Sequence, residues 1–152
     1  MADEAFKELT VLVAEDSDYY RRLIVTNLKA MGVGTTEEAT NGEDAFQLQH
    51  RRLVDLALVD WVMEPMDGLE LTRKVRRDPR SADRELPIIM ITAHTDEERV
   101  FGARDASVAE ILTKPITAES LYSRMYSAVM HPRPFIDGDN YAGPERRQGE
   151  QA

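Results

Sequence analysis

The sequence predicts an α/β fold in which five helices cover a doubly wound, five-stranded parallel sheet. Short apolar segments typical of buried strands alternate along the chain with segments whose apolar residues recur at helical spacing. This alternation indicates a parallel sheet with right-handed crossovers and helices on both faces. Three of the five strands are strongly apolar, whereas the second and the fifth are more polar and suit the sheet edges. The flavodoxin-like strand order 2-1-3-4-5 accounts for this difference.

The individual strands are recognised by their length and their aliphatic content. We expect the three central strands at residues 10–14, 56–59 and 87–91, each of which is a short run of mainly aliphatic residues. The edge strands are expected near residues 34–39, which are mostly polar, and at residues 109–112, which include a glutamate.

Capping residues, glycines and prolines mark where the helices begin and end. Ser17 can cap the first helix, which Gly32 and Gly34 end, and the Asn41-Gly42 pair precedes the second. The five helices are expected at about residues 18–31, 42–52, 69–77, 96–104 and 118–129.

The composition changes near the C-terminus, which divides the chain into residues 1–130 and residues 131–152. The first part is long enough for one domain with a full core, and the second is rich in proline and glycine. We expect the second part to be an irregular tail, with flexible disorder as the simplest state. Phe135, Ile136 and Tyr141 support an alternative, an interaction arm. With Arg146 and Arg147, such an arm would dock on an acidic surface of the same chain or of a second copy.

Composition excludes several classes of function. The formal charge is 19 − 28 = −9, which argues against a nucleic-acid-binding surface because phosphate contacts need clustered lysine and arginine. No apolar stretch is long enough for a signal peptide or a membrane span. The chain has no cysteine, which excludes disulfides and thiolate chemistry and is compatible with the cytoplasm, the expected location.

Chemically active side chains follow four of the five predicted strands. Glu15 and Asp16 follow the first strand, Asp60 the third, Thr92 the fourth and Lys114 the fifth. Because the C-terminal ends of parallel strands lie at the same edge, we expect these side chains to meet in one crevice. Three crowded carboxylates favour a bound Mg²⁺, and a lysine and a hydroxyl complete a site for a phosphoryl group with Asp60 as the nucleophile.

These segments resemble the receiver domain of bacterial two-component response regulators, of the stand-alone, CheY-like kind. The matching segments are V-L-V-A-E-D-S, D-W-V-M-E-P-M-D-G, I-M-I-T-A and the K-P of L-T-K-P-I, within residues 8–130. The resemblance implies that Asp60 is the phosphoacceptor, and that Asp16, Asp60 and the Val62 carbonyl bind Mg²⁺ directly. It also implies that Glu15 acts mostly through water, that Thr92 bonds a phosphoryl oxygen and that Lys114 pairs with it. The Lys114-Pro115 bond is expected to be cis.

The resemblance also implies a function. We expect a phosphorylation-switched protein that takes a phosphoryl group from a sensor histidine kinase and hydrolyses it slowly, without being an enzyme in the usual sense. Its output is expected to be protein contacts with an unidentified target, with no output domain and with a homodimer possible. The alternative is a phosphorelay intermediate that passes the group to a histidine phosphotransfer protein. Ile111 departs from the family, which usually has an aromatic switch residue there, and Glu64 replaces the usual proline of the loop.

Overall fold

A computed structural model describes residues 3–93, 107–138 and 141–145 of the chain. The predicted fourth helix, at residues 96–104, lies outside the described residues. The secondary-structure elements are η1 (Glu4–Phe6), β1 (Thr10–Ala14), α1 (Asp18–Ala30), β2 (Thr35–Ala39), α2 (Gly42–Arg51), β3 (Leu56–Asp60), α3 (Gly68–Arg77), β4 (Ile88–Thr92), β5 (Glu110–Thr113), α5 (Ala118–Met130), β6 (Phe135–Asp137) and β7 (Ala142–Pro144).

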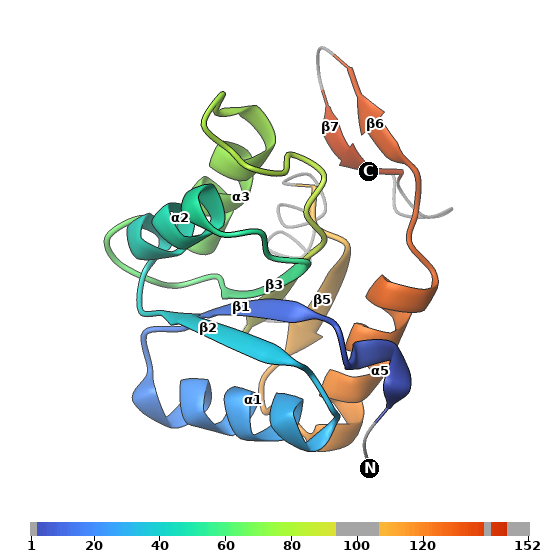
Figure 1. Cartoon of the computed structure of the whole chain (residues 1–152). Helices are drawn as coiled ribbons and strands as arrows, with labels where there is room; N and C mark the ends of the chain where they lie inside the picture. Colours follow the sequence, from blue (N-terminus) through green and yellow to red (C-terminus); the bar gives the residue numbers. More distant parts are fainter. Residues whose placement is uncertain (1–2, 94–106, 139–140, 146–152) are drawn as a thin grey trace.

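The main sheet has five parallel strands in the order β2-β1-β3-β4-β5, which confirms the predicted topology (Figure 1). All residues of β3 and β4 are buried, whereas β2 is largely accessible, as its polar sequence predicted. A central strand loses water from both faces, so its side chains are apolar on both, except at the C-terminal ends of β3 and β4, where Asp60 and Thr92 lie.

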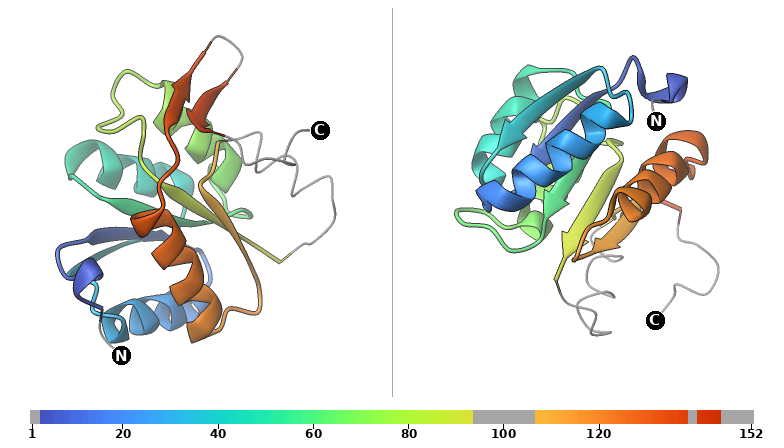
Figure 2. Two further views of the ribbon diagram at one scale, coloured as in Figure 1. Left: turned by 90° about the vertical axis from the view of Figure 1, so that its right-hand side faces the viewer. Right: turned by 90° about the horizontal axis from the view of Figure 1, so that it is seen from below.

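Helices cover the two faces of the sheet (Figures 1 and 2). α1 and α5 pack on one face, where Ile24, Leu28, Leu121 and Met125 join alternate residues of the strands in one apolar cluster. α2 and α3 pack on the other face and form a second cluster with the remaining strand residues. Alternation of side chains along each strand therefore supplies both layers of the core.

The helices start at polar caps that the sequence contains. The side chain of Ser17 accepts a hydrogen bond from the backbone N–H of Tyr20, and Asn41 caps α2 in the same way. Asp67 and Glu70 form a reciprocal capping box at the start of α3. Each cap satisfies N–H groups that the helix leaves unpaired and stabilises it by about 1 kcal/mol. No helix in the described ranges is long and apolar enough to cross a membrane.

The C-terminal segment contains a structure that the sequence analysis did not predict. Residues 131–134 have no regular structure, but β6 and β7 then form an antiparallel hairpin in which Ile136 pairs with Gly143. The hairpin packs against α3 and against Ser107. The expectation of an irregular tail is therefore wrong for residues 135–137 and 142–144, because contacts with the domain hold a segment too short to fold alone.

Candidate functional site at the C-terminal ends of the strands

The register of the parallel sheet brings the predicted residues together. Ala14 pairs with Val59 and Asp60 pairs with Ile91, so Glu15, Asp60 and Thr92 lie at successive strand ends. Thr92 pairs with Thr113, and the carbonyl of Thr92 accepts a hydrogen bond of 2.8 Å from the backbone N–H of Lys114. The sequence analysis placed these side chains at one edge of the sheet, and the structure places them there.

Three carboxylates form the acidic part of the site. One carboxylate oxygen from each of Glu15, Asp16 and Asp60 lies within 4.8 Å of the others. Glu15 is fully buried and Asp60 is 5% exposed, whereas Asp16 faces solvent. The site is thus a pair of buried carboxylates with a third at its opening.

Lys114 lies between the two buried carboxylates. Its Nζ is 3.1 Å from Glu15 Oε1 and 3.3 Å from Asp60 Oδ1. The same Nζ lies 4.1 Å from the centre of the Tyr20 ring, within the range of a cation–π contact. The Lys114-Pro115 peptide bond is cis, as predicted. One ammonium group therefore balances part of the charge of two carboxylates.

Burial and mutual repulsion shift the titration of these groups. Burial, followed by the charge of Asp60, raises the pKa of Glu15 to about 7. Burial also raises the pKa of Asp60, although the charge of Lys114 opposes this shift. Burial by itself lowers the pKa of Lys114, but the charges of Asp60 and Glu15 outweigh it, so the net shift is upward. Lys114 therefore stays charged, but its one positive charge faces two buried carboxylates, Glu15 and Asp60.

The loop after Asp60 needs a glycine to fold over the strand end. A Cβ on Gly68, the first residue of α3, would lie 2.6 Å from the carbonyl oxygen of Asp60. The backbone N–H of Gly68 donates a hydrogen bond of 2.9 Å to the carbonyl of Trp61. A larger residue at position 68 would push α3 away from the phosphoacceptor candidate. Glu64, in the same loop, is exposed.

Three further residues that the sequence analysis singled out are Thr92, Val62 and Ile111. Thr92 is 1% exposed, at the end of β4. The side chain of Val62 is exposed, and the use of its carbonyl as a ligand stays a prediction. Ile111 is half-buried on β5 and packs against the apolar cluster beneath α2 and α3.

Two residues of the site were not predicted as part of it. Tyr20 lies in the first turn of α1, and this position places its ring on Lys114. Arg21 donates a hydrogen bond of 3.0 Å to the carbonyl of Glu15 and pairs with Asp18 and Glu38. A helix that starts directly after a strand end of the predicted site presents its first turn to that site, and this rule would have identified both residues.

The donor atoms fit a hard divalent cation. All are carboxylate oxygens, the ligands that Mg²⁺ prefers. Glu15 Oε1 is buried, and its partner is the ammonium of Lys114, 3.1 Å away, which Asp60 shares. One ammonium shared by two buried carboxylates, with the pKa of Glu15 raised by burial and by the charge of Asp60, favours a further positive charge at the site. A cation at the opening beside Asp16 would supply it.

Replacing Glu15 with glutamine is expected to remove a pH-dependent loss of stability. Between about pH 4.5 and 7 the folded state keeps a proton on Glu15 that the unfolded state has lost. The free energy of unfolding therefore falls as pH rises through this window, by on the order of 2 kcal/mol between pH 5.5 and 7. Glutamine does not titrate, so the stability of Glu15→Gln should not fall in this window for that reason. Urea unfolding of both proteins in EDTA at pH 5.5 and pH 8 measures the difference.

The control for this experiment is Mg²⁺ itself. Added Mg²⁺ at pH 8 should raise the melting temperature of the wild type more than that of Glu15→Gln, because the cation stabilises the ionised carboxylates. If the wild type and Glu15→Gln differed in free energy of unfolding by the same amount at both pH values, the raised pKa could not be assigned to Glu15.

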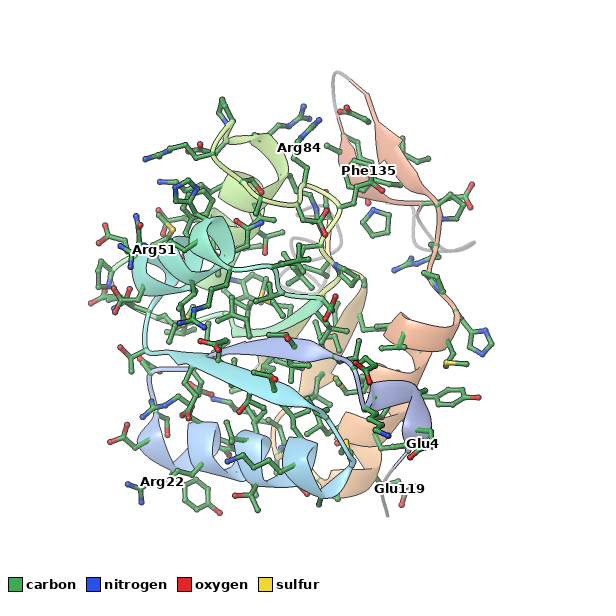
Figure 3. All side chains as sticks on the ribbon, viewed as in Figure 1. Glu4, Arg22, Arg51, Arg84, Glu119 and Phe135 are labelled. Carbon is green, nitrogen blue, oxygen red and sulfur yellow. The ribbon has the colours of Figure 1, made fainter. Side chains whose placement is uncertain are left out.

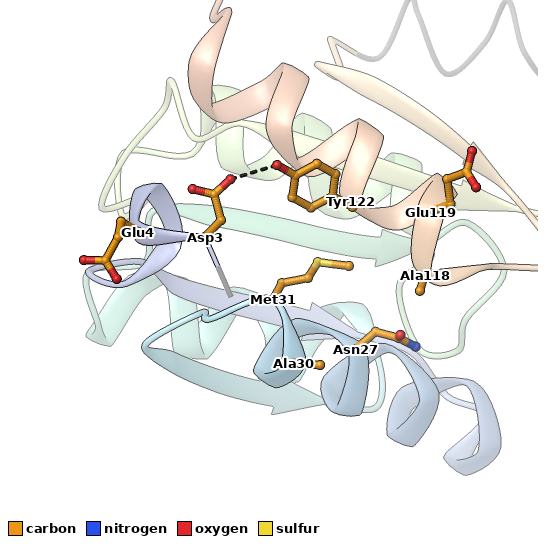
Figure 4. Close-up of a pocket in the computed structure, with 8 residues that line it drawn as sticks. All are labelled: Asp3, Glu4, Asn27, Ala30, Met31, Ala118, Glu119 and Tyr122. Atoms are coloured by element: carbon orange, nitrogen blue, oxygen red, sulfur yellow. Dashed lines mark hydrogen bonds between the residues drawn. The ribbon is translucent and has the colours of Figure 1, made fainter. Parts of the chain in front are cut away.

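A separate cavity of about 630 Å³ lies between η1, the end of α1 and the start of α5 (Figure 4). Asp3 on one side accepts a 2.8 Å hydrogen bond from the hydroxyl of Tyr122 on the other, and Met31 contributes an apolar wall. None of the residues predicted for the phosphoryl site lines this cavity. The convergence of charged groups, rather than cavity size, therefore identifies the functional site.

Comparisons with known proteins agree with this geometry. The family model of the response regulator receiver domain matches residues 11–126 of the chain. The chain is 32% identical over 117 residues to the chemotaxis protein CheY of Pseudomonas aeruginosa, which covers 77% of this chain and 93% of that protein. It is 30% identical over 119 residues to the chemotaxis protein CheY-3 of Vibrio cholerae, covering 78% and 90%.

Solved structures show the same fold. A putative response regulator from Chloroflexus aurantiacus superimposes with a TM-score of 0.75 at 27% identity, over 81% of this chain and 98% of that one. The Vibrio cholerae chemotaxis protein CheY4 gives a TM-score of 0.70 at 26% identity, over 77% and 95%. With a family model that matches most of its length, the chain belongs to the response regulator receiver family of two-component signal transduction.

Proposed function

We propose that the protein is a receiver that accepts a phosphoryl group on Asp60 from the phosphohistidine of a sensor histidine kinase. The observation that carries the proposal is the position of the Lys114 ammonium between Glu15 and Asp60. A structural ion pair needs one carboxylate for one ammonium. A second buried carboxylate and a third at the opening favour a site built for a metal and a phosphoryl group.

The transfer is a substitution at phosphorus. A carboxylate oxygen of Asp60 forms the new P–O bond while the P–N bond to the donor imidazole breaks, and the imidazole nitrogen keeps the electron pair. Lys114, 3.3 Å from Asp60, attracts the phosphoryl oxygens as charge develops on them. The hydroxyl of Thr92 donates a hydrogen bond to one of these oxygens in the phosphorylated state.

Glu15, Asp16 and Asp60 would hold Mg²⁺, with the Val62 carbonyl as a further ligand. The cation supplies positive charge that neutralises the carboxylates and the phosphoryl oxygens. The buried pair of carboxylates forms the inner side of the site, and exposed Asp16 marks the side that is open to the donor.

The phosphorylated protein would act through contacts with a target protein. Receivers of this family are signalling proteins, so the slow hydrolysis of the acyl phosphate serves to reset the switch rather than to turn over a substrate. We place the protein in the cytoplasm, where a kinase would present its phosphohistidine.

The test is covalent modification by a small phosphodonor. Incubation with acetyl phosphate and Mg²⁺ should add one phosphoryl group, and peptide mapping after borohydride reduction should locate it at Asp60. The same incubation with EDTA should leave the protein unmodified. A phosphoryl group mapped to any other residue would overturn the assignment.

A further inference from the structure

The aromatic ring of Tyr20 is an uncharged neighbour of the Lys114 ammonium group. The centre of the ring lies 4.1 Å from Nζ, well inside the distance at which the face of an aromatic ring attracts a cation. Nζ therefore contacts the ring as well as Oε1 of Glu15, at 3.1 Å, and Oδ1 of Asp60, at 3.3 Å. Only 15% of the Lys114 side chain is exposed, so little water screens the contact with the ring.

The fold fixes this ring in place. Tyr20 lies in the first turn of α1, where its backbone N–H donates a hydrogen bond of 3.3 Å to the side chain of Ser17. Arg21, the next residue, donates to the carbonyl of Glu15 and ties the same turn to the end of β1. Tyr20 is half-buried and packs against the apolar cluster of α1 and α5, whereas Arg22 extends from the outer side of α1 into solvent (Figure 3). The ring thus comes from the side of α1 that faces the sheet.

The carboxylates that contact Lys114 are the ones that the proposed function assigns to Mg²⁺. Oxygens of Glu15 and Asp60 that bind a metal are weaker partners for Lys114, because its ammonium group carries a charge of the same sign as the metal. The lysine side chain is long and flexible, so weaker partners leave it free to take other rotamers. The ring of Tyr20 is not a ligand for a hard cation, and its attraction for Nζ does not depend on the carboxylates.

We propose that Tyr20 is a positioning residue for phosphoryl transfer, because the face of its ring holds the Lys114 ammonium beside Asp60 while the carboxylate oxygens bind the metal. This inference rests on the proposed function and adds a residue to it. In this role the ring touches neither the metal nor the phosphoryl group. It acts through Lys114, which attracts the phosphoryl oxygens as the new P–O bond forms. The π electrons of the ring, rather than the hydroxyl, supply the attraction.

Changing the electrons of the ring tests this role without changing the packing. Tyr20→Phe keeps the ring and should be phosphorylated by acetyl phosphate, with Mg²⁺ in excess, within about twofold of the wild-type rate. The same substitution with fluorines on the new ring has nearly the same shape, but fluorine withdraws π electrons and weakens the attraction for a cation. The rate should fall with each added fluorine, by about three- to tenfold in total, and Tyr20→Leu should show a similar loss. A side chain that only filled space would give equal rates along the fluorine series.

Proton NMR of the unphosphorylated protein tests the contact separately from the reaction. Methylene protons that lie over an aromatic ring resonate upfield because of the ring current. The ε-methylene protons of Lys114 should therefore be shifted upfield in the wild type and in Tyr20→Phe, and should return to the ordinary lysine position in Tyr20→Leu. The upfield shift should persist when Mg²⁺ replaces EDTA. A shift that disappeared on addition of Mg²⁺ would overturn the proposal, because the ring would then release Lys114 when it is needed.

Tyr19→Leu is the matched control. Tyr19 is the neighbouring residue in the same turn, but its side chain is 72% exposed and its ring packs against that of Tyr20, with 5.4 Å between the ring centres. This variant should be phosphorylated within about twofold of the wild-type rate, and urea unfolding should show that every variant is folded under the assay conditions. A wild type that gained no phosphoryl group would overturn the proposed function and this role with it. Equal rates in the wild type, Tyr20→Leu and the fluorine series would overturn the role of Tyr20 alone.

Discussion

Asp60→Asn is expected to abolish phosphorylation by acetyl phosphate completely. Asparagine keeps the shape of the side chain, but its amide is no nucleophile toward phosphorus. The neighbouring groups, Lys114 at 3.3 Å and the carboxylates of Glu15 and Asp16, stay in place. The loss would therefore come from the attacking oxygen alone. Intact-mass spectrometry after incubation with acetyl phosphate and Mg²⁺ measures it.

Asp67→Asn provides a control of the same chemistry in the neighbouring loop. Asp67 caps α3, and asparagine caps a helix about as well as aspartate does. This variant should be phosphorylated at the wild-type level. If Asp60→Asn still gained a phosphoryl group on another residue, Asp60 would not be the sole acceptor.

Arg76→Met is expected to lower the free energy of unfolding by on the order of 3–4 kcal/mol, more than the other substitutions proposed for this protein. Arg76 is 2% exposed, and burial lowers the pKa of its guanidinium to about 10, so it is still charged at neutral pH. It donates hydrogen bonds of 2.7–2.8 Å to the carbonyls of Arg84, Leu86 and Ser107. Methionine fills a similar volume but leaves these carbonyls without their donor.

Arg77→Met is the matched control, because Arg77 is exposed and its side-chain hydrogen bond to the carbonyl of Gly138 is long at 3.4 Å. Its free energy of unfolding should stay within about 0.5 kcal/mol of the wild type. Urea unfolding of both variants measures the comparison. Equal losses would show that the carbonyl contacts of Arg76 contribute little.

The sequence by itself determined the main sheet and which strand-end residues meet at one edge of it. The three strands that are apolar on both faces are central and the two more polar strands lie at the edges, because burial on two faces disfavours polar side chains except at the strand ends. The convergence of Glu15, Asp60, Thr92 and Lys114 follows from parallel strands, whose C-terminal ends share one edge. Both are consequences of local pattern combined with a topological rule, and neither depends on a particular long-range contact.

The tertiary structure alone decided the roles of Arg76, Tyr20 and the C-terminal hairpin. Arg76 stands in the basic run R-K-V-R-R, which indicates an exposed helix end, and only the carbonyls that loops bring to it explain its burial. The hairpin contains too much proline and glycine to be recognised from local propensity. It is held by Arg84, Arg77 and Ser107, residues far away in the chain. Contacts between distant residues leave no periodic signal in a single sequence, so only the folded chain reveals them.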